Sequence, residues 1–322
     1  MKKYFVAGGA GFIGSHLVKK LLLDKSIGKI IIYDNFSSGK KWHLESVLND
    51  KRLEIICGDI KDLDQLTLSM NGSDVVYHFA SNPDIAKAAL EPDIDFWEGT
   101  YLTNNILEAM RKAGVFRLLY ASGSGVYGET GQTAVIENHE NMKPISTYGA
   151  SKLGCEALIC SYGHMFKIKG SAFRFANVVG PNQTHGVGFD FIRKLISNNS
   201  RLEIFGDGEQ SKSYIYVTDV LSAMQLIENK QKEIFSTFNV SPPDYITVNQ
   251  IADLICKIME LKDVKYFHTG GDRGWKGDVP VIRLDTKRIR SFGWKNEYSC
   301  KEAIEKSILS IYEDAKKKRF NW

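Results

Sequence analysis

The sequence contains no apolar run close to the roughly 18 residues that a membrane-spanning helix needs, so no membrane partner is expected. An apolar signal segment is missing too, because the N-terminus runs directly into a predicted strand, and we expect a cytoplasmic protein. Cysteines are few, and their scattered spacing is unlike that of metal ligands, so we expect reduced thiols and no metal site. They are Cys57, Cys155, Cys160, Cys256 and Cys300.

The chain also lacks a strong charge of one sign. Its formal net charge is +4, and part of that excess lies in residues 316–319, which we interpret as a solvated helix end. A nucleic-acid partner is therefore not expected. Apolar residues, in contrast, are plentiful: 43% of the 322 residues are hydrophobic and 25% are charged, which is enough for one large domain or two lobes.

Short β-branched runs alternate with helical segments, a pattern typical of right-handed βαβ units. The predicted strands are residues 3–8, 29–34, 53–57, 74–80, 116–122 and 170–176. With helices between them, these strands predict an α/β protein with a doubly wound parallel sheet of the Rossmann type.

From about residue 180 the pattern loosens, and prolines such as Pro181 and Pro280 separate shorter elements. We therefore expect an NAD-binding domain over residues 1–180 and a smaller α/β substrate-binding lobe over residues 181–322. Chain crossings between the two lobes are part of this expectation.

Gly8, Gly11 and Gly14 stand between the first predicted strand and an amphipathic helix. Such glycines make a tight turn, let a diphosphate approach the helix N-terminus and allow the helix to pack closely on the strand. Asp34 ends the second strand, where a carboxylate can accept both hydroxyls of the adenosine ribose. The same carboxylate would repel a 2′-phosphate, so the pattern predicts NAD rather than NADP.

Tyr148 and Lys152 are four residues apart, so on a helix they lie on one face. A free phenol has a pKa of about 10 and is a poor base at neutral pH unless something favours its anion. The Lys152 ammonium and an oxidised nicotinamide would both favour that anion. Tyr148 is therefore the candidate catalytic base, with Lys152 as its partner.

Further short motifs follow one another along the chain. They are Asp34-Asn35-Phe36-Ser37-Ser38-Gly39, Gly58-Asp59-Ile60, Tyr77-His78-Phe79-Ala80-Ser81, Gly125-Val126-Tyr127-Gly128, residues 174–181, 206–210 and 214–219, and Gly277-Asp278-Val279-Pro280. With these motifs the chain resembles, over nearly its whole length, the extended short-chain dehydrogenase/reductases of the NAD-dependent nucleotide-sugar epimerase/dehydratase family. UDP-glucose 4-epimerase is the best-known member that it resembles.

The resemblance implies roles for residues at matching positions. For NAD it implies Phe12 and Ile13 at the helix start, Asn35, Ser37 and Ser38 after Asp34, Asp59 and Ile60 beside the adenine, and Phe79, Ala80 and Ser81 near the nicotinamide ribose. For a nucleotide-sugar substrate it implies Asn177, Lys212 and Arg273 at the diphosphate. Arg binds phosphate with two prongs, whereas Lys offers only a point charge.

The chain departs from the family in the loop before Tyr127. Relatives usually carry a catalytic Ser or Thr where this sequence has Gly123, so either Ser122 or Ser124 could bond the sugar O4, with a slight preference for Ser124. Where 4,6-dehydratases of the family carry an acid that moves protons at C5 and C6, this sequence has Gly125. The missing acid argues against a dehydratase.

These features predict an enzyme that inverts C4 of a sugar nucleotide through a 4-keto intermediate. The alternatives are a 4,6-dehydratase, a 4-dehydrogenase or a ketosugar reductase on the same scaffold and, more remotely, a non-catalytic NAD-binding regulator.

The resemblance also implies a homodimer that pairs the helix at about 96–112 with the helix carrying Tyr148. Apolar residues on these helices are compatible with such an interface, namely Leu102, Ile106, Leu107, Met110, Leu153, Ala157 and Leu158. Burial of the same residues against their own sheet is the alternative.

Overall fold

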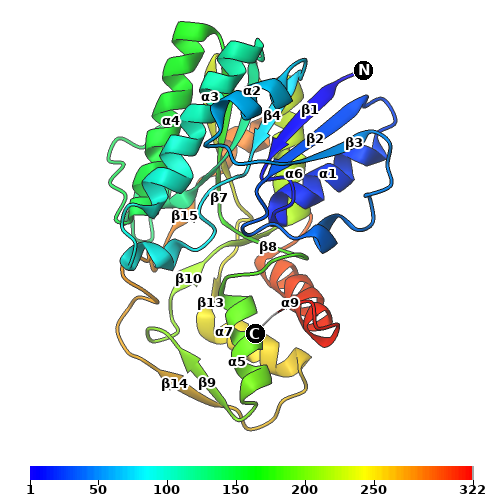
Figure 1. Cartoon of the computed structure of the whole chain (residues 1–322). Helices are drawn as coiled ribbons and strands as arrows, with labels where there is room; N and C mark the ends of the chain where they lie inside the picture. The colour runs from blue at the N-terminus through cyan, green and yellow to red at the C-terminus, as the bar shows by residue number, and fades with distance from the viewer. Residues whose placement is uncertain (321–322) are drawn as a thin grey trace. The chain divides into compact units, whose positions relative to one another are not determined.

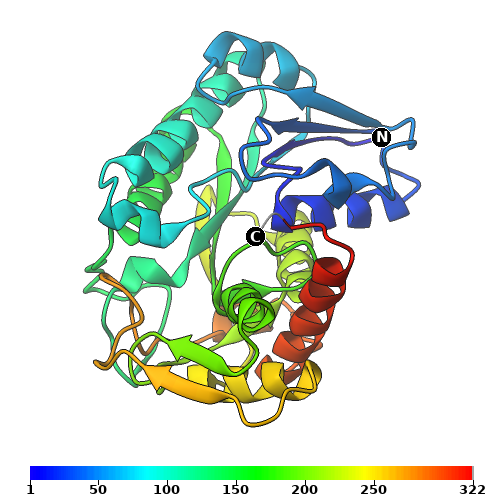
Figure 2. The ribbon, with the colours of Figure 1, turned by 60° about the horizontal axis from the view of Figure 1, so that its bottom comes forward.

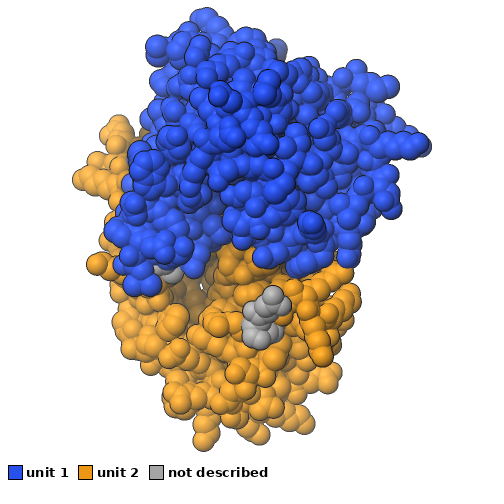
Figure 3. All heavy atoms as spheres, viewed as in Figure 1, with its two compact units in different colours: residues 1–126, 147–174, 221–238 blue, residues 127–146, 175–220, 239–322 orange. Residues whose placement is uncertain are grey.

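In the computed structural model, which describes residues 1–320, the chain divides into two compact units. Unit 1 comprises residues 1–126, 147–174 and 221–238, and unit 2 comprises residues 127–146, 175–220 and 239–322 (Figure 3). A single cut at residue 180 does not reproduce these units, because residues 127–146 belong to unit 2 and residues 221–238 to unit 1. The chain therefore crosses between the units several times.

The central sheet has seven strands in the order β12-β7-β5-β4-β1-β2-β3. They are β1 (Lys3–Ala7), β2 (Lys29–Asp34), β3 (Leu53–Cys57), β4 (Val75–His78), β5 (Arg117–Gly123), β7 (Lys169–Phe175) and β12 (Phe235–Val240). Strands β1 to β5 pair in parallel. The six predicted strands and the doubly wound fold are confirmed, and β12 is an addition. The order reverses between β1 and β4, where open sheets of this kind bind ligands.

Helices cover both faces of this sheet. Helices α2 (Leu63–Met70), α3 (Tyr101–Ala113) and α4 (Thr147–Phe166) lie on one face, and α1 (Phe12–Leu23) and α6 (Val217–Lys230) lie on the other (Figure 1). The first three helices share one core with the sheet, to which α2 contributes Leu66, α3 contributes Ile106 and α4 contributes Ile159. This core holds α4, the helix that carries Tyr148, against the strands.

The segment 96–112 uses its apolar residues for this core. The core contains Leu102, Ile106, Leu107 and Met110, each at most 5% exposed. These four residues are therefore buried against the chain's own sheet, as the alternative interpretation expected. The segment begins as a short π-helix, η3 (Phe96–Thr100), which leaves Phe96 51% and Trp97 46% exposed. Short π-helical stretches are frequent at functional sites.

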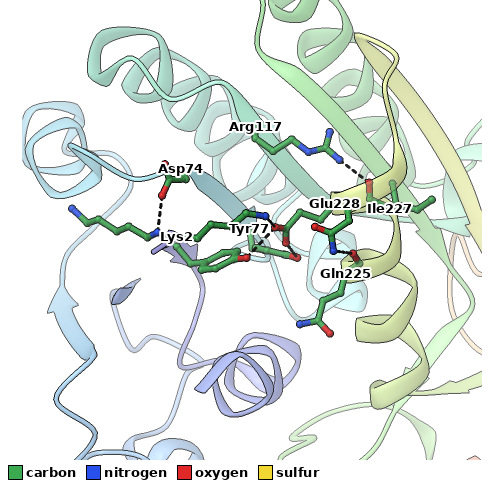
Figure 4. A network of polar contacts seen from close by, with 10 residues as sticks. Lys2, Asp74, Tyr77, Arg117, Gln225, Ile227 and Glu228 are labelled. Carbon is green, nitrogen blue, oxygen red and sulfur yellow. Dashed lines mark hydrogen bonds and ion pairs between the residues drawn. The ribbon is translucent and has the colours of Figure 1, made fainter. Parts of the chain in front are cut away.

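A buried carboxylate ties α6 to the sheet. Glu228 Oε2 accepts a hydrogen bond from the Tyr77 hydroxyl at 2.6 Å, and Oε1 accepts from Lys2 at 2.8 Å and from the Tyr4 hydroxyl at 3.0 Å (Figure 4). Burial, followed by the Glu228 charge, raises the pKa of Tyr77 well above its ordinary value, so this phenol stays protonated and donates. These donors offset the cost of removing the carboxylate from water.

Unit 2 combines a helical cluster with pairs of short strands. Helices α5 (Val187–Ser197), α7 (Val248–Ile258) and α9 (Cys300–Lys316) pack on one another (Figure 2), and α8 (Lys287–Ser291) is a single short turn. The paired strands are β8 (Asn177–Val179) with β11 (Tyr214–Tyr216), β10 (Ser211–Lys212) with β13 (Ile246–Thr247), β9 (Arg201–Ile204) with β14 (Lys265–His268), and β6 (Ala134–Val135) with β15 (Arg283–Leu284). Capping boxes begin α7 and α9.

Helices that combine the length and the apolar character needed to cross a bilayer do not occur within residues 1–320.

Candidate active site

The turn after β1 leaves the N-terminus of α1 open. Gly8 has a φ of 77°, and a Cβ there would lie 2.7 Å from the backbone nitrogen of Ala80. A Cβ on Gly14 would lie 2.3 Å from the carbonyl oxygen of Gly8. Gly11 is the N-cap residue and has no side chain to bond the first N–H groups of the helix, those of Phe12 and Ile13. These groups are therefore available to an anion such as a diphosphate.

Asp34 ends β2 and is 8% exposed. Its Oδ2 accepts a hydrogen bond from the Ala10 N–H at 2.8 Å, and its Oδ1 accepts one from the Phe36 N–H at 2.8 Å. Burial raises the pKa of this carboxyl, while the backbone donors act in the opposite direction. A carboxylate has about four lone-pair sites, so acceptor capacity remains for ribose hydroxyls. The turn and Asp34 together fit the adenosine half of NAD.

The other predicted cofactor residues follow the carboxyl ends of neighbouring strands. Asn35, Ser37 and Ser38 follow β2, Asp59 and Ile60 follow β3, and Phe79, Ala80 and Ser81 follow β4. The N–H groups of Phe79 and Ala80 both donate to the Ala7 carbonyl, at 2.9 and 3.2 Å. Because β1 to β4 are parallel, these residues gather at one edge of the sheet.

Tyr148 and Lys152 lie in the first turns of α4 and share one face of it. The Lys152 residue is 4% exposed, and its Nζ donates to the Ala121 carbonyl at 2.9 Å. The same Nζ lies 5.3 Å from the centre of the Tyr148 ring and 5.0 Å from that of Tyr120. The Lys152 ammonium is therefore held beside the Tyr148 ring.

The two candidate serines have different surroundings. Ser122 is 5% exposed, and its hydroxyl donates to Glu156 Oε1 at 2.6 Å. Ser124 begins the short helix η4 (Ser124–Tyr127), is partly exposed, and forms no side-chain hydrogen bond with any residue from 1 to 320. A Cβ on Gly123 would lie 3.9 Å from Tyr148 Cε1. The Ser or Thr that relatives usually carry at this position would therefore lie beside the Tyr148 ring. Of the two serines, Ser122 therefore has a side-chain partner within residues 1–320 and Ser124 has none.

The predicted substrate residues lie in unit 2, where two of them contact one acid. Lys212 forms an ion pair with the Asp278 carboxylate, and Arg273 donates to the Asp278 carbonyl at 3.2 Å. Arg273 also pairs with Glu129. Asn177 begins β8, which pairs with β11 just beyond Lys212. The structure therefore brings the three residues into one region of unit 2.

Sequence reasoning missed three residues that form hydrogen bonds or ion pairs with the predicted site residues or with their neighbours in the chain: Glu156, Asp278 and Asp95. Glu156 lies four residues after Lys152, so its helical spacing could have revealed it. Asp278 lies in a quoted motif, but its pairing with Lys212 spans 66 residues. Asp95 could not be found from a local pattern, because its side chain accepts hydrogen bonds from Asn82, 13 positions away, and from Thr147, 52 positions away.

Two histidines of unit 1 are buried. His43 Nδ1 lies 2.8 Å from the Ala10 carbonyl oxygen, and His78 Nε2 lies 3.1 Å from the Thr103 hydroxyl. Burial lowers the pKa of His43 to about 4, from an ordinary 6.5. Burial, followed by the charge of Lys152, lowers that of His78 to about 3. Both rings are therefore neutral at pH 7, and the Nδ1–H of His43 donates to Ala10.

We expect the free energy of unfolding to fall as the pH drops from about 6.5 toward 4, because the unfolded histidines bind protons that the buried rings do not. The stabilisation is complete above pH 6.5, and at pH 5 each buried histidine should cost about 2 kcal/mol. Urea denaturation at pH 7, 6 and 5 measures this slope. His43→Asn, which keeps an N–H donor near Ala10, should flatten it, whereas the exposed His164→Asn should not; equal slopes in all three proteins would contradict the expectation.

A glycine turn, a strand-terminal acid and a Tyr–Lys helix on a doubly wound sheet define an NAD-dependent enzyme of the short-chain dehydrogenase/reductase type. The sequence model of the NAD dependent epimerase/dehydratase family matches residues 4–241, and the chain belongs to this family. The cofactor is therefore NAD.

Relatives include both epimerases and dehydratases. A putative UDP-glucose 4-epimerase of Methanocaldococcus jannaschii is 34% identical over 310 residues, which cover 94% of this chain and 96% of that protein. The human dTDP-D-glucose 4,6-dehydratase is 28% identical, with 95% and 89% covered. A crystal structure of a UDP-galactose 4-epimerase has a TM-score of 0.86 at 33% identity, with 97% and 99% covered. The family thus specifies the chemistry in general but leaves the reaction open.

Proposed function

We propose that the enzyme inverts C4 of a hexose carried on a nucleoside diphosphate, of the UDP-glucose, UDP-N-acetylglucosamine or UDP-glucuronate type, through a 4-keto sugar. The observation that carries this proposal is the Tyr148–Lys152 pair beside a loop without an acid. A Cβ on Gly125 would lie 3.6 Å from the Cα of Gly149, so an acid at position 125 would lie next to this pair. A dehydratase needs such a group to move protons at C5 and C6, and glycine supplies none.

In this proposal Tyr148 takes the proton of the sugar O4 and later returns it. Lys152, held by the Ala121 carbonyl, stabilises the anionic phenol, and the Ser124 hydroxyl orients O4. NAD, held by the turn after β1 and by Asp34, would supply a reversible hydride acceptor for C4, so that the hydride could return to the opposite face of the sugar. The product has the same oxidation state as the substrate, so the enzyme consumes no external oxidant.

The diphosphate would be bound by residues of unit 2. Lys212 and Arg273 each have a carboxylate partner, Asp278 and Glu129 respectively. The diphosphate of a nucleotide sugar carries two negative charges, as many as these two carboxylates together, and Arg273 can bind two of its oxygens at once. We propose that Asn177, Lys212 and Arg273 bind the diphosphate while the 4-keto sugar rotates to present its opposite face.

Incubation of the enzyme with UDP-glucose, UDP-N-acetylglucosamine and UDP-glucuronate, followed by proton NMR, tests the function. Appearance of the C4 epimer of one of them is the expected result. A 4-keto-6-deoxy sugar would identify a dehydratase, and stoichiometric NADH would identify a dehydrogenase. Bound NAD without turnover of any sugar nucleotide would favour the regulator.

Ser124→Ala should lower kcat by about 10-fold or more, because the sugar O4 loses the hydroxyl that orients it. Ser122→Ala should change kcat less and stability more, because the Ser122 hydroxyl already bonds Glu156. Steady-state kinetics and thermal melting of the two variants measure both effects. A larger loss of kcat in Ser122→Ala would reverse the assignment.

We propose a homodimer in which Phe96 and Trp97 lie at the interface, because they are large, apolar and about half exposed next to α3. Light scattering at micromolar concentration should give the mass of a dimer for the wild type. The double change Phe96→Ser and Trp97→Ser should shift the mass to that of a monomer. Phe116→Ser, at a residue 52% exposed outside this segment, is the control; a monomeric wild type would refute the proposal.

A further inference from the structure

Asp95 is a buried acid whose carboxylate bonds two segments far apart in the sequence. The residue is 1% exposed and lies just before η3. Its Oδ1 accepts a hydrogen bond from Asn82 Nδ2 at 2.8 Å, and its Oδ2 accepts one from the Thr147 hydroxyl at 2.7 Å. Both oxygens therefore act as acceptors, each toward a different segment.

The two partners adjoin the predicted chemical groups. Asn82 directly follows Ser81, the last residue of the segment assigned to the nicotinamide ribose. Thr147 is the first residue of α4 and directly precedes Tyr148. The carboxylate thus links the segment after β4 to the helix turn that carries the candidate base.

A second contact connects the same residue to the next turn of α4. The backbone carbonyl of Asp95 accepts a hydrogen bond from the Ser151 hydroxyl at 2.7 Å, and Ser151 directly precedes Lys152. The Thr100 hydroxyl lies 2.9 Å from the same Ser151 oxygen. A Cβ on Gly99 would lie 2.3 Å from that oxygen, so a side chain at 99 would displace the Ser151 hydroxyl from this position.

The burial of Asp95 has an electrostatic cost, because a charge is removed from water and its side-chain partners Asn82 and Thr147 are neutral. Two features offset that cost: both carboxylate oxygens accept strong hydrogen bonds, and the charge lies at the N-terminus of α4, where the helix dipole favours an anion. What Asp95 provides is a polar group bonded to both Asn82 and Thr147, which an apolar residue of the same volume could not supply.

We propose that Asp95 is a positioning residue, which sets the place of Tyr148 relative to the nicotinamide-ribose segment by bonding Asn82 and Thr147 at once. This inference rests on the proposed function of Tyr148. A base displaced by about 1 Å can lose about 100-fold in rate, so loss of the link should lower kcat rather than substrate affinity.

The test compares three variants with the NAD-loaded wild type on the sugar nucleotide that the wild type converts. Asp95→Ala should lower kcat 10- to 100-fold and change KM less than threefold. Asp95→Asn can still accept from Asn82 and can donate to the Thr147 hydroxyl, so its kcat should stay within threefold of the wild type. Asp93→Ala, at an exposed acid two residues earlier, is the control and should match the wild type.

Thr147→Val removes only one of the two hydrogen bonds to the Asp95 carboxylate. It tests the same proposal if the Asp95→Ala variant does not fold. It should lower kcat in the same direction and still unfold cooperatively on heating, with a lower melting temperature because one buried carboxylate oxygen loses its donor. Equal kcat in Asp95→Ala and the wild type would overturn the proposal, as would an asparagine variant as impaired as the alanine variant.

Hydrogen exchange separates this proposal from the proposed function. In the NAD-loaded protein Asp95→Ala should speed exchange in peptides covering residues 79–84 and 145–152, whereas Asp95→Asn and Asp93→Ala should not. If the wild type converts no sugar nucleotide, the proposed function fails and exchange alone decides the link. Unchanged exchange in both peptides of Asp95→Ala would overturn it.

Discussion

Tyr148→Phe is expected to abolish turnover, with a loss of about 10²–10⁴ in kcat, while NAD and sugar-nucleotide binding stay nearly intact. The change removes the phenol oxygen that would accept the O4 proton and keeps the ring that packs near Lys152 Nζ at 5.3 Å. Rates come from the epimerisation assay, and affinities come from calorimetry with NAD and with the sugar nucleotide that the wild type converts.

Tyr162→Phe is the matched control for this change. Tyr162 lies on the same helix, and its hydroxyl donates to Glu108 at 2.8 Å, away from the proposed chemistry. Its kcat should equal that of the wild type. If Tyr148→Phe keeps most of its activity on the true substrate, Tyr148 is not the base and a role confined to binding explains it better.

Glu156→Ala is expected to lower the free energy of unfolding by about 3–5 kcal/mol. Glu156 and Arg174 form a doubly bonded ion pair with both side chains 4% exposed, and Arg174 Nη2 lies 2.6 Å from Glu156 Oε2. Removing the acid leaves a buried guanidinium without its carboxylate and deprives the Ser122 hydroxyl of its acceptor. Urea denaturation at pH 7 measures the loss.

The double variant Glu156→Leu with Arg174→Met separates the buried charge from the packing. Because no unpaired charge remains, it should recover more than half of the loss seen in Glu156→Ala. Glu54→Ala is the surface control. Glu54 and its ion-pair partner Lys29 are both more than 40% exposed, so the free energy of unfolding should fall by less than about 1 kcal/mol. A loss in Glu156→Ala no larger than that of Glu54→Ala would contradict this account.

Most of the sheet could be predicted because its strands are short apolar runs bounded by turns, and all six predicted strands appear within two residues of their expected ends. Strand β12 was not predicted because it contains the polar residues Ser236, Thr237 and Asn239, which the structure nevertheless buries. Asn239 is bonded to the Tyr127 hydroxyl and the Val135 carbonyl, more than 100 residues away. A local pattern cannot reveal such distant partners.

The apolar stripe of the segment 96–112 shows the same limit. Helical spacing predicts which residues share a face, but it does not say whether that face meets a sheet or a second subunit. Packing decided this for Leu102 and Ile106, which lie in the core of unit 1, and left the neighbouring Phe96 and Trp97 exposed.

The sequence by itself determined the fold class, through its alternation of short apolar strands and helices, and it determined the cofactor and the shared helix face of Tyr148 and Lys152, which depend on spacing within one turn or one helix. Only the tertiary structure decided that the Ser122 hydroxyl donates to Glu156 and that the Asp95 carboxylate accepts hydrogen bonds from both Asn82 and Thr147. Hydrogen-bond partners on different elements depend on how those elements are placed in space, and the residues that meet there carry no mutual spacing along the chain.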